Sequence, residues 1–312
     1  MERKKIILRL LFTHILLVPV LILFSFFLKN DSILVLAIAQ VVLVIAFFTG
    51  YWEFFGLRFK WIYTIFMTSV IVLFFKIRVK EYLPDVHRLV FIFFSLVLVF
   101  LLVHFIKILL VIFESAKEPY ELRFLFGQGR FLITDGGNSR RSRLMNYHYF
   151  SPIHKKNGTN RSMLYATDLV KLSGSKNKFL PKQNCEYPIY EENIYSPMDG
   201  VIFKVINGIP DNIPFSGNYP YNTGNTVVIK NEDYYFLLGH LRLDSINVQE
   251  GEKIQAGQLV AKIGNSGWTE RPHLHMQLIK SASENYWHGT GVPITYMNKN
   301  LFKNRIIDMP RK

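Results

Sequence analysis

The stretch from Gly264 to His275 reads Gly-Asn-Ser-Gly-Trp-Thr-Glu-Arg-Pro-His-Leu-His, and it decides the fold of the second half of the chain. The residues that follow, through Ile279, alternate roughly between apolar and polar side chains after the glycine turn, which predicts a β-strand. Side chains at i and i+2 of a strand project from the same face. His273 and His275 are therefore expected to reach one common ligand or substrate.

Two histidines do not complete a zinc site, because a catalytic zinc ion usually takes three protein ligands with nitrogen or carboxylate oxygen donors. A further histidine, His240, lies upstream in the sequence Leu-Gly-His-Leu. Two short strand-like stretches carry His148 and Asp168, and pairing as a hairpin would place these two side chains opposite each other. The chain has one cysteine, Cys185, which excludes an intramolecular disulfide and a cysteine-rich zinc site.

Several segments of the C-terminal half resemble, in order and spacing, the lysostaphin-type zinc metalloendopeptidases, which cut peptide cross-links in bacterial peptidoglycan. They are Tyr195–Val201, Gly224–Ile229, Gly239–Leu241, Val248–Gly251, Ala256–Gln258 and Gly264–His275. The resemblance implies a mainly antiparallel β domain with the lysostaphin-type metallopeptidase fold, a duplicated hybrid motif. It also implies that His148, Asp168 and His275 bind Zn²⁺, with His240 and His273 as the catalytic residues.

The first metal ligand departs from the commonest pattern of this family. That pattern places its first histidine four positions before the aspartate, whereas His148 is twenty positions before Asp168. A branch with a longer insertion, reading roughly Asn-x-His and later Tyr-Ala-x-Asp, is closer to this chain. His154 is the competing first ligand. Of His240 and His273, one would accept or orient a proton of the attacking water and the other would stabilise the oxyanion.

The first third of the chain is strongly apolar and is predicted to be an α-helical membrane region with about four hydrophobic segments. These run from Ile6 to Leu28, Ile33 to Tyr51, Trp61 to Phe75 and Leu89 to Phe113. Most reach the roughly 20 residues that span a bilayer, and the third is the shortest. The first segment exceeds a signal-peptide core and no small-residue cleavage site follows it, so we expect it to remain as an anchor.

Three parts follow along the chain. Residues 1–113 form the transmembrane region, 114–145 a tether with early strands, and 146–312 the zinc metallopeptidase domain, whose short apolar stretches are broken by Gly, Pro and Asn.

Lysine and arginine residues are balanced between the two sides of the predicted helices, so charge does not orient the protein in the membrane. The expected substrate places the catalytic domain on the extracytoplasmic side of the cell membrane. This requires either an outward N-terminus or a third segment that lies at the interface. The net charge of +14 favours anionic lipid head groups or wall polymers. No nucleic-acid motif accompanies it, so the expected partners are peptidoglycan peptides, membrane lipid and a regulatory membrane partner.

The sequence thus predicts a multi-pass, membrane-anchored zinc metalloendopeptidase that hydrolyses peptide bonds in peptidoglycan stem peptides or cross-bridges. Two alternatives remain open. The β domain could be a non-catalytic binding or regulatory module that controls other cell-wall hydrolases, or the protease could cut a secreted peptide or protein. A complete ligand set favours an enzyme over the binding module.

Overall fold

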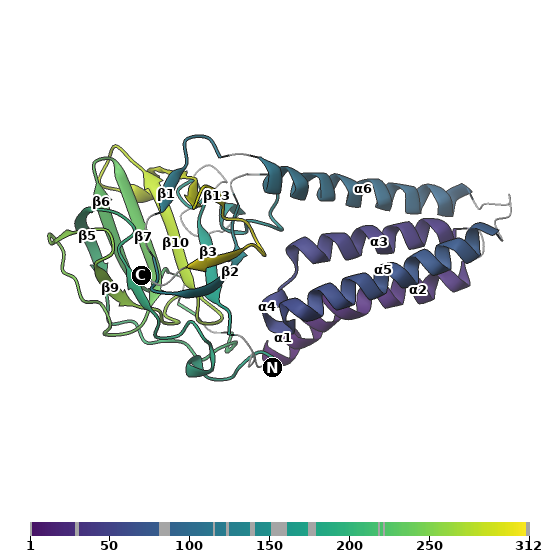
Figure 1. Cartoon of the computed structure of the whole chain (residues 1–312), viewed down its shortest axis with the longest axis horizontal. Helices are drawn as coiled ribbons and strands as arrows, with labels where there is room; N and C mark the ends of the chain where they lie inside the picture. The colour runs from purple at the N-terminus through teal and green to yellow at the C-terminus, as the bar shows by residue number, and fades with distance from the viewer. Residues whose placement is uncertain are drawn as a thin grey trace. The chain divides into compact units, whose positions relative to one another are not determined.

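The computed structural model describes residues 2–28, 31–80, 88–114, 116–122, 125–137, 141–150, 161–173, 179–217, 219–220 and 222–309. The chain forms two compact units, Arg3–Leu110 and Val111–Lys312, each described by itself below (Figure 1).

The first unit is helical and confirms the predicted apolar segments. Its helices are α1 (Glu2–Leu11), α2 (Leu17–Phe27), α3 (Ser32–Thr49), α4 (Trp52–Phe55), α5 (Leu57–Lys80) and α6 (Arg88–Phe113), with a π-helical turn, Phe12–Leu16, joining α1 to α2. Four stretches within these helices are long and apolar enough to cross a membrane: Lys4–Phe27, Ser32–Thr49, Leu57–Arg78 and Phe91–Phe113.

The third segment is longer than predicted. Helix α5 extends beyond both ends of the apolar stretch Trp61–Phe75 and includes the basic residues that flank it, such as Arg58 and Lys76. Long basic side chains at helix ends can bury their stems and keep their charges in water, so they need not end a spanning helix. By length, α5 is therefore not restricted to the interface.

Helices α2, α3 and α5 share a small apolar core. Ile22, Leu36, Leu43 and Ile71 are buried in it. Large apolar side chains remain exposed on the outside of the helices, which is the distribution expected of segments that face lipid rather than water.

The second unit is built on one large antiparallel sheet, which confirms the predicted fold class. Along the sheet the order is β14 (Ile306–Met309), β2 (Gly129–Asp135), β3 (Thr167–Lys171), β10 (Leu274–Lys280), β7 (Tyr234–Leu241), β6 (Asn225–Asn231), β5 (Gly200–Ile206) and β8 (Lys253–Ile254), and β11 (Thr290–Val292) also pairs with β10. A three-stranded sheet contains β1 (Tyr120–Leu122), β12 (Ile294–Tyr296) and β13 (Lys299–Asn300), and a two-stranded sheet contains β4 (Asn193–Tyr195) and β9 (Leu259–Lys262).

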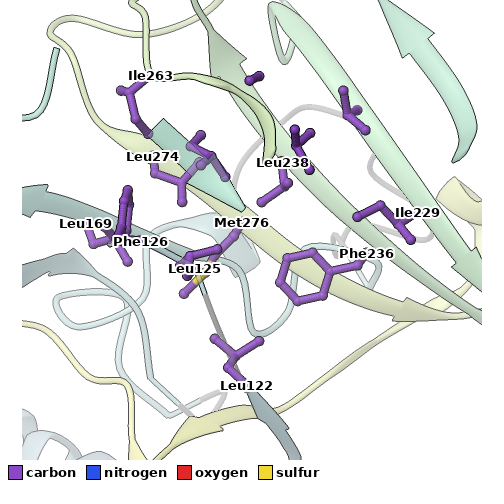
Figure 2. Close-up of a cluster of buried hydrophobic side chains, with 14 of the residues drawn as sticks. Leu122, Leu125, Phe126, Leu169, Ile229, Phe236, Leu238, Ile263, Leu274 and Met276 are labelled. Atoms are coloured by element: carbon purple, nitrogen blue, oxygen red, sulfur yellow. The ribbon is translucent and has the colours of Figure 1, made fainter. Parts of the chain in front are cut away.

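One face of the large sheet carries the hydrophobic core. Figure 2 shows Phe236 and Leu238 of β7 beside Met276 of β10, with Leu169 of β3 nearby, and all four are buried. Since neighbouring residues of a strand point to opposite faces, the burial of Leu274 and Met276 in this core turns the residue between them to the other face. That residue is His275.

Candidate metal centre

His275 and Asp168 face each other across two adjacent strands. The antiparallel register of β10 and β3 pairs His275 with Asp168 and, on the core side, Leu274 with Leu169. Nδ1 of His275 lies 2.9 Å from Oδ1 of Asp168. Nε2 lies 3.0 Å from the amide oxygen of Gln277, which can accept a hydrogen bond only if Nε2 carries the proton. That arrangement leaves Nδ1 available as a ligand atom.

His148 reaches the same carboxylate by a different route from the one predicted. It begins a 3₁₀ turn, His148–Phe150, and β3 pairs with β2 and β10, so the predicted hairpin that would set His148 opposite Asp168 is wrong. The segment is a loop because the side chain of Asn146 donates hydrogen bonds to the backbone carbonyls of Gly137 and Leu164. Nε2 of His148 nevertheless lies 3.2 Å from Oδ2 of Asp168.

The donor atoms of His148, Asp168 and His275 lie within 4.8 Å of one another, and both imidazoles are buried. Two imidazole nitrogens and one carboxylate oxygen form a donor set that catalytic zinc sites use, and the cluster is compact enough for one ion. The residues present therefore fit a zinc ion. His154, the alternative first ligand, lies outside the described residues.

The charges in this cluster are those of a cation site. Burial raises the pKa of Asp168, but His148 and His273 outweigh it and hold this pKa well below its usual value, so the carboxylate is ionised. Burial lowers the pKa of His148, whereas Asp168 and Asp135, together with the backbone of Ala166, raise it to about 9. A proton on His148 thus balances the surrounding carboxylates, and a divalent cation bound there would take over that role.

His240 and His273 lie beside the cluster, so all five predicted site residues are brought together. Nε2 of His273 is 3.4 Å from Oδ2 of Asp168. The ring centroid of His240 is 4.8 Å from that of His273 and 5.6 Å from that of His275.

Backbone carbonyls orient these two histidines. Nδ1 of His240 donates to the carbonyl of Ser266 at 2.8 Å, and Nδ1 of His273 lies 2.9 Å from the carbonyl of Arg271. A proton on Nδ1 leaves the Nε2 atom of each ring as an acceptor. Burial, reinforced by His273 and His275, lowers the pKa of His240 well below its usual value, so this ring is neutral.

Sequence reasoning missed the groups that support the histidines. A carbonyl such as that of Ser266 has no side-chain signature, so its contact with His240 could not be predicted. Gln277 could have been found, because it lies two residues after His275 on the same strand and so shares its face. Asp135 gave no signal, because its place beside His148 depends on the register shift in β2.

The contact between His240 and Ser266 depends on Gly224. Gly224 has φ of 72°, and a Cβ atom there would lie 2.1 Å from the carbonyl oxygen of Ser266. Gly251 has a similar φ of 86°, but a Cβ atom there would meet nothing within 4 Å. A substitution at Gly251 tests only the cost of the left-handed backbone. A substitution at Gly224 adds the cost of displacing Ser266.

We expect Gly224→Ala to destabilise the β unit more than Gly251→Ala. The backbone penalty of about 1–2 kcal/mol applies to both variants, and only the first must also move Ser266 and the ring of His240. The opening free energy of amides in β6 and β7, measured by hydrogen exchange on the full chain, tests this expectation. Equal losses in the two variants would contradict it.

The mainly antiparallel β unit gathers two histidines and an aspartate that could hold a metal ion, with two more histidines beside them, which is a set of side chains that metallohydrolases use. Residues 187–287 match the sequence model of peptidase family M23. Lipoprotein NlpD of Yersinia enterocolitica is 34% identical over 77 residues, which cover 25% of this chain and 74% of that protein. The chain belongs to peptidase family M23, which confirms the lysostaphin-type resemblance.

Two other proteins resemble part of this chain. The peptidoglycan DD-endopeptidase ShyA of Vibrio cholerae is 35% identical over 108 residues, which cover 35% of this chain but only 20% of ShyA. A zinc-containing peptidase from Vibrio cholerae, known from a crystal structure, is 21% identical with a TM-score of 0.30, covering 61% of this chain and 41% of that one. Among the site residues, His148 and Asp168 precede the family match, whereas His240, His273 and His275 lie within it.

Proposed function

We propose that the protein is a membrane-anchored zinc metalloendopeptidase that hydrolyses peptide bonds in peptidoglycan stem peptides or cross-bridges. The observation that carries this proposal is the convergence of His148, Asp168 and His275 within 4.8 Å beside two further oriented histidines. Membership of peptidase family M23 supports the reaction class, and the similarity to an enzyme named as a peptidoglycan endopeptidase supports the substrate class.

His148, Asp168 and His275 would hold the zinc ion. When bound, Zn²⁺ supplies Lewis-acid polarisation of the scissile carbonyl and activation of water. Neutral His240, whose Nδ1–H is engaged by Ser266, is assigned the acceptance of a proton at Nε2. His273, whose Nδ1–H is held by the carbonyl of Arg271, is assigned the hydrogen bond to the developing oxyanion, which it donates from Nε2 when that atom also carries a proton.

We expect the full-length chain, purified in detergent with about one zinc per chain, to release new amines from purified peptidoglycan. A chelator should abolish the release and added zinc should restore it. Amine release that a chelator leaves unchanged would contradict the zinc mechanism. Bound zinc without cleavage would instead favour the binding or regulatory module, or a protease of a secreted peptide or protein.

We further propose that the β unit lies on the extracytoplasmic side of the cell membrane, where peptidoglycan is found. Four spanning helices return the chain to the side on which it started, so this placement requires an outward N-terminus.

Cys185 offers a direct test of this placement, because it is the only cysteine of the chain and is exposed. A membrane-impermeant maleimide is expected to label Cys185 on intact cells. The matched control is Cys185→Ser, which should remain unlabelled. Labelling that appears only after lysis would place the β unit in the cytoplasm and exclude peptidoglycan as its substrate.

A further inference from the structure

The ring of His148 stands between two carboxylates. Its Nε2 atom lies 3.2 Å from Oδ2 of Asp168, and its Nδ1 atom lies 3.8 Å from Oδ1 of Asp135. The side chains are largely shielded from solvent, at 9% exposure for His148 and 15% for Asp135. Asp135 ends β2 and lies outside the segment that matches family M23.

A β-bulge brings Asp135 to this position. Strand β2 pairs Ile133 with Leu169, but then pairs Asp135 with Asp168, so it contains one more residue than β3 across this step. In an uninterrupted ladder Asp135 would lie opposite Thr167 and share the core face of Ile133. The extra residue instead moves Asp135 to the face that carries Asp168, in keeping with the use of bulges to re-aim side chains next to sites.

The loop that carries His148 is fastened to the same end of β2. Oδ1 of Asp135 accepts a hydrogen bond from the backbone N–H of Tyr147 at 2.7 Å. The backbone N–H of Gly136 donates to the carbonyl of Met145 at 2.9 Å. Asp135 therefore fixes the residue immediately before His148 and also faces the imidazole itself.

The outward nitrogen of His148 is less well held than that of His275. His275 has Gln277 at 3.0 Å, whereas Nδ1 of His148 is buried and makes no well-formed hydrogen bond to the described residues, although the backbone of Ala166 is close enough to raise the pKa of this ring. A metal-bound histidine almost always donates its second ring N–H to a carboxylate, a carbonyl or water, which fixes the tautomer and makes the ligand more basic. Asp135 presents a carboxylate oxygen 3.8 Å from this nitrogen, less than 1 Å beyond hydrogen-bond range.

We propose that Asp135 is a positioning residue for the metal site: it holds the imidazole of His148 through Nδ1, so that Nε2 points toward Asp168 and the zinc ion. This inference rests on the proposed zinc site. It accounts for the use of a histidine twenty residues before Asp168, on a loop outside the sheet, as a ligand. Hydrogen bonds from Tyr147 to Asp135 and from Gly136 to Met145 tie the loop to the bulged end of β2.

The test measures zinc affinity of the full-length chain in detergent by competition with a chromogenic chelator. Asp135→Asn keeps an oxygen that can accept from Tyr147 but removes the charge facing His148. We expect it to weaken zinc binding about 10–100-fold, with little change in the thermal unfolding of the metal-free chain. The matched control is Asp308→Asn on the neighbouring strand β14, where the aspartate is exposed and paired with Arg130, and zinc affinity should stay within about twofold of wild type.

Zinc affinity is read without peptidoglycan, so the outcome does not depend on cleavage. An unchanged affinity in Asp135→Asn would overturn the positioning role and leave the zinc site intact, because the backbone carbonyl of Ala166 would then be the partner of His148. A wild-type chain that binds no zinc would overturn both this inference and the proposed function. If Asp135→Asn weakens zinc binding but the wild-type chain cuts no peptidoglycan, the positioning role is supported and only the proposed activity is rejected.

A second measurement keeps the inference testable if Asp135→Asn does not fold. In a crystal structure of the zinc-loaded wild-type chain, the distance between Nδ1 of His148 and Oδ1 of Asp135 should shorten to about 2.7–3.0 Å. A hydrogen bond from Nδ1 to Ala166 in place of Asp135 would overturn the proposal.

Discussion

Replacement of His275 by alanine is expected to remove zinc from the chain and to slow peptidoglycan cleavage by about a thousandfold or more. His275 is held in the middle of the sheet by pairing with both β3 and β7, and its Nδ1 atom lies 2.9 Å from Asp168. A bound metal contributes several kcal/mol of transition-state stabilisation, and each 1.4 kcal/mol or so corresponds to a factor of ten in rate.

Bound zinc is measured by elemental analysis and cleavage by the release of amines. Asp168→Ala should give the same double loss, since its carboxylate lies between both imidazole ligands. His288→Ala is the matched control, because His288 is an exposed histidine on the 3₁₀ turn Tyr286–His288 and should keep both zinc and activity. Full zinc content and full activity in His275→Ala and Asp168→Ala would show that the proposed site is not the metal site.

The second large effect is expected at His240 and His273, where activity should fall while zinc stays bound. Loss of a general base or of an oxyanion donor typically costs about 10²–10⁴-fold in rate. Because His240 has φ of 60°, its replacement should tolerate left-handed backbone, so His240→Asn is preferable to alanine. His273→Ala needs no such precaution, since His273 does not have a positive φ.

The decisive comparison is between zinc content and turnover in the same preparation. Retained zinc with an unchanged KM and a lowered kcat would fit residues that act on the transition state. Loss of zinc in either variant would instead make that histidine a ligand. Normal turnover in both variants would remove them from the mechanism.

The elements with a strong sequence pattern could be predicted. Four apolar stretches predicted the helices that are long and apolar enough to cross a membrane, because length and hydropathy suffice for that inference. The strand that carries His275 could be predicted from its alternating pattern. His275 and Asp168 were predicted separately as metal ligands, and the register of the two strands places them opposite each other.

The rest depended on tertiary structure. The path of the loop around His148 is decided by hydrogen bonds to distant backbone groups, which local propensity does not encode. A one-residue bulge reverses which face Asp135 occupies, and no pattern within β2 marks it. The length of α5 was underestimated because the apolar stretch ends at basic residues, and the helix continues through them.

The site is divided between two stretches of sequence, and this division affects how relatives can be interpreted. Residues 187–287 would still be recognised as family M23 in a chain that had lost β2, β3 and the loop between them. Such a chain would keep three of the four site histidines but only one of the three proposed ligands. Membership of the family and the proposed competence to cleave a peptide bond are therefore separate properties, because the second also requires His148 and Asp168, which precede the family match.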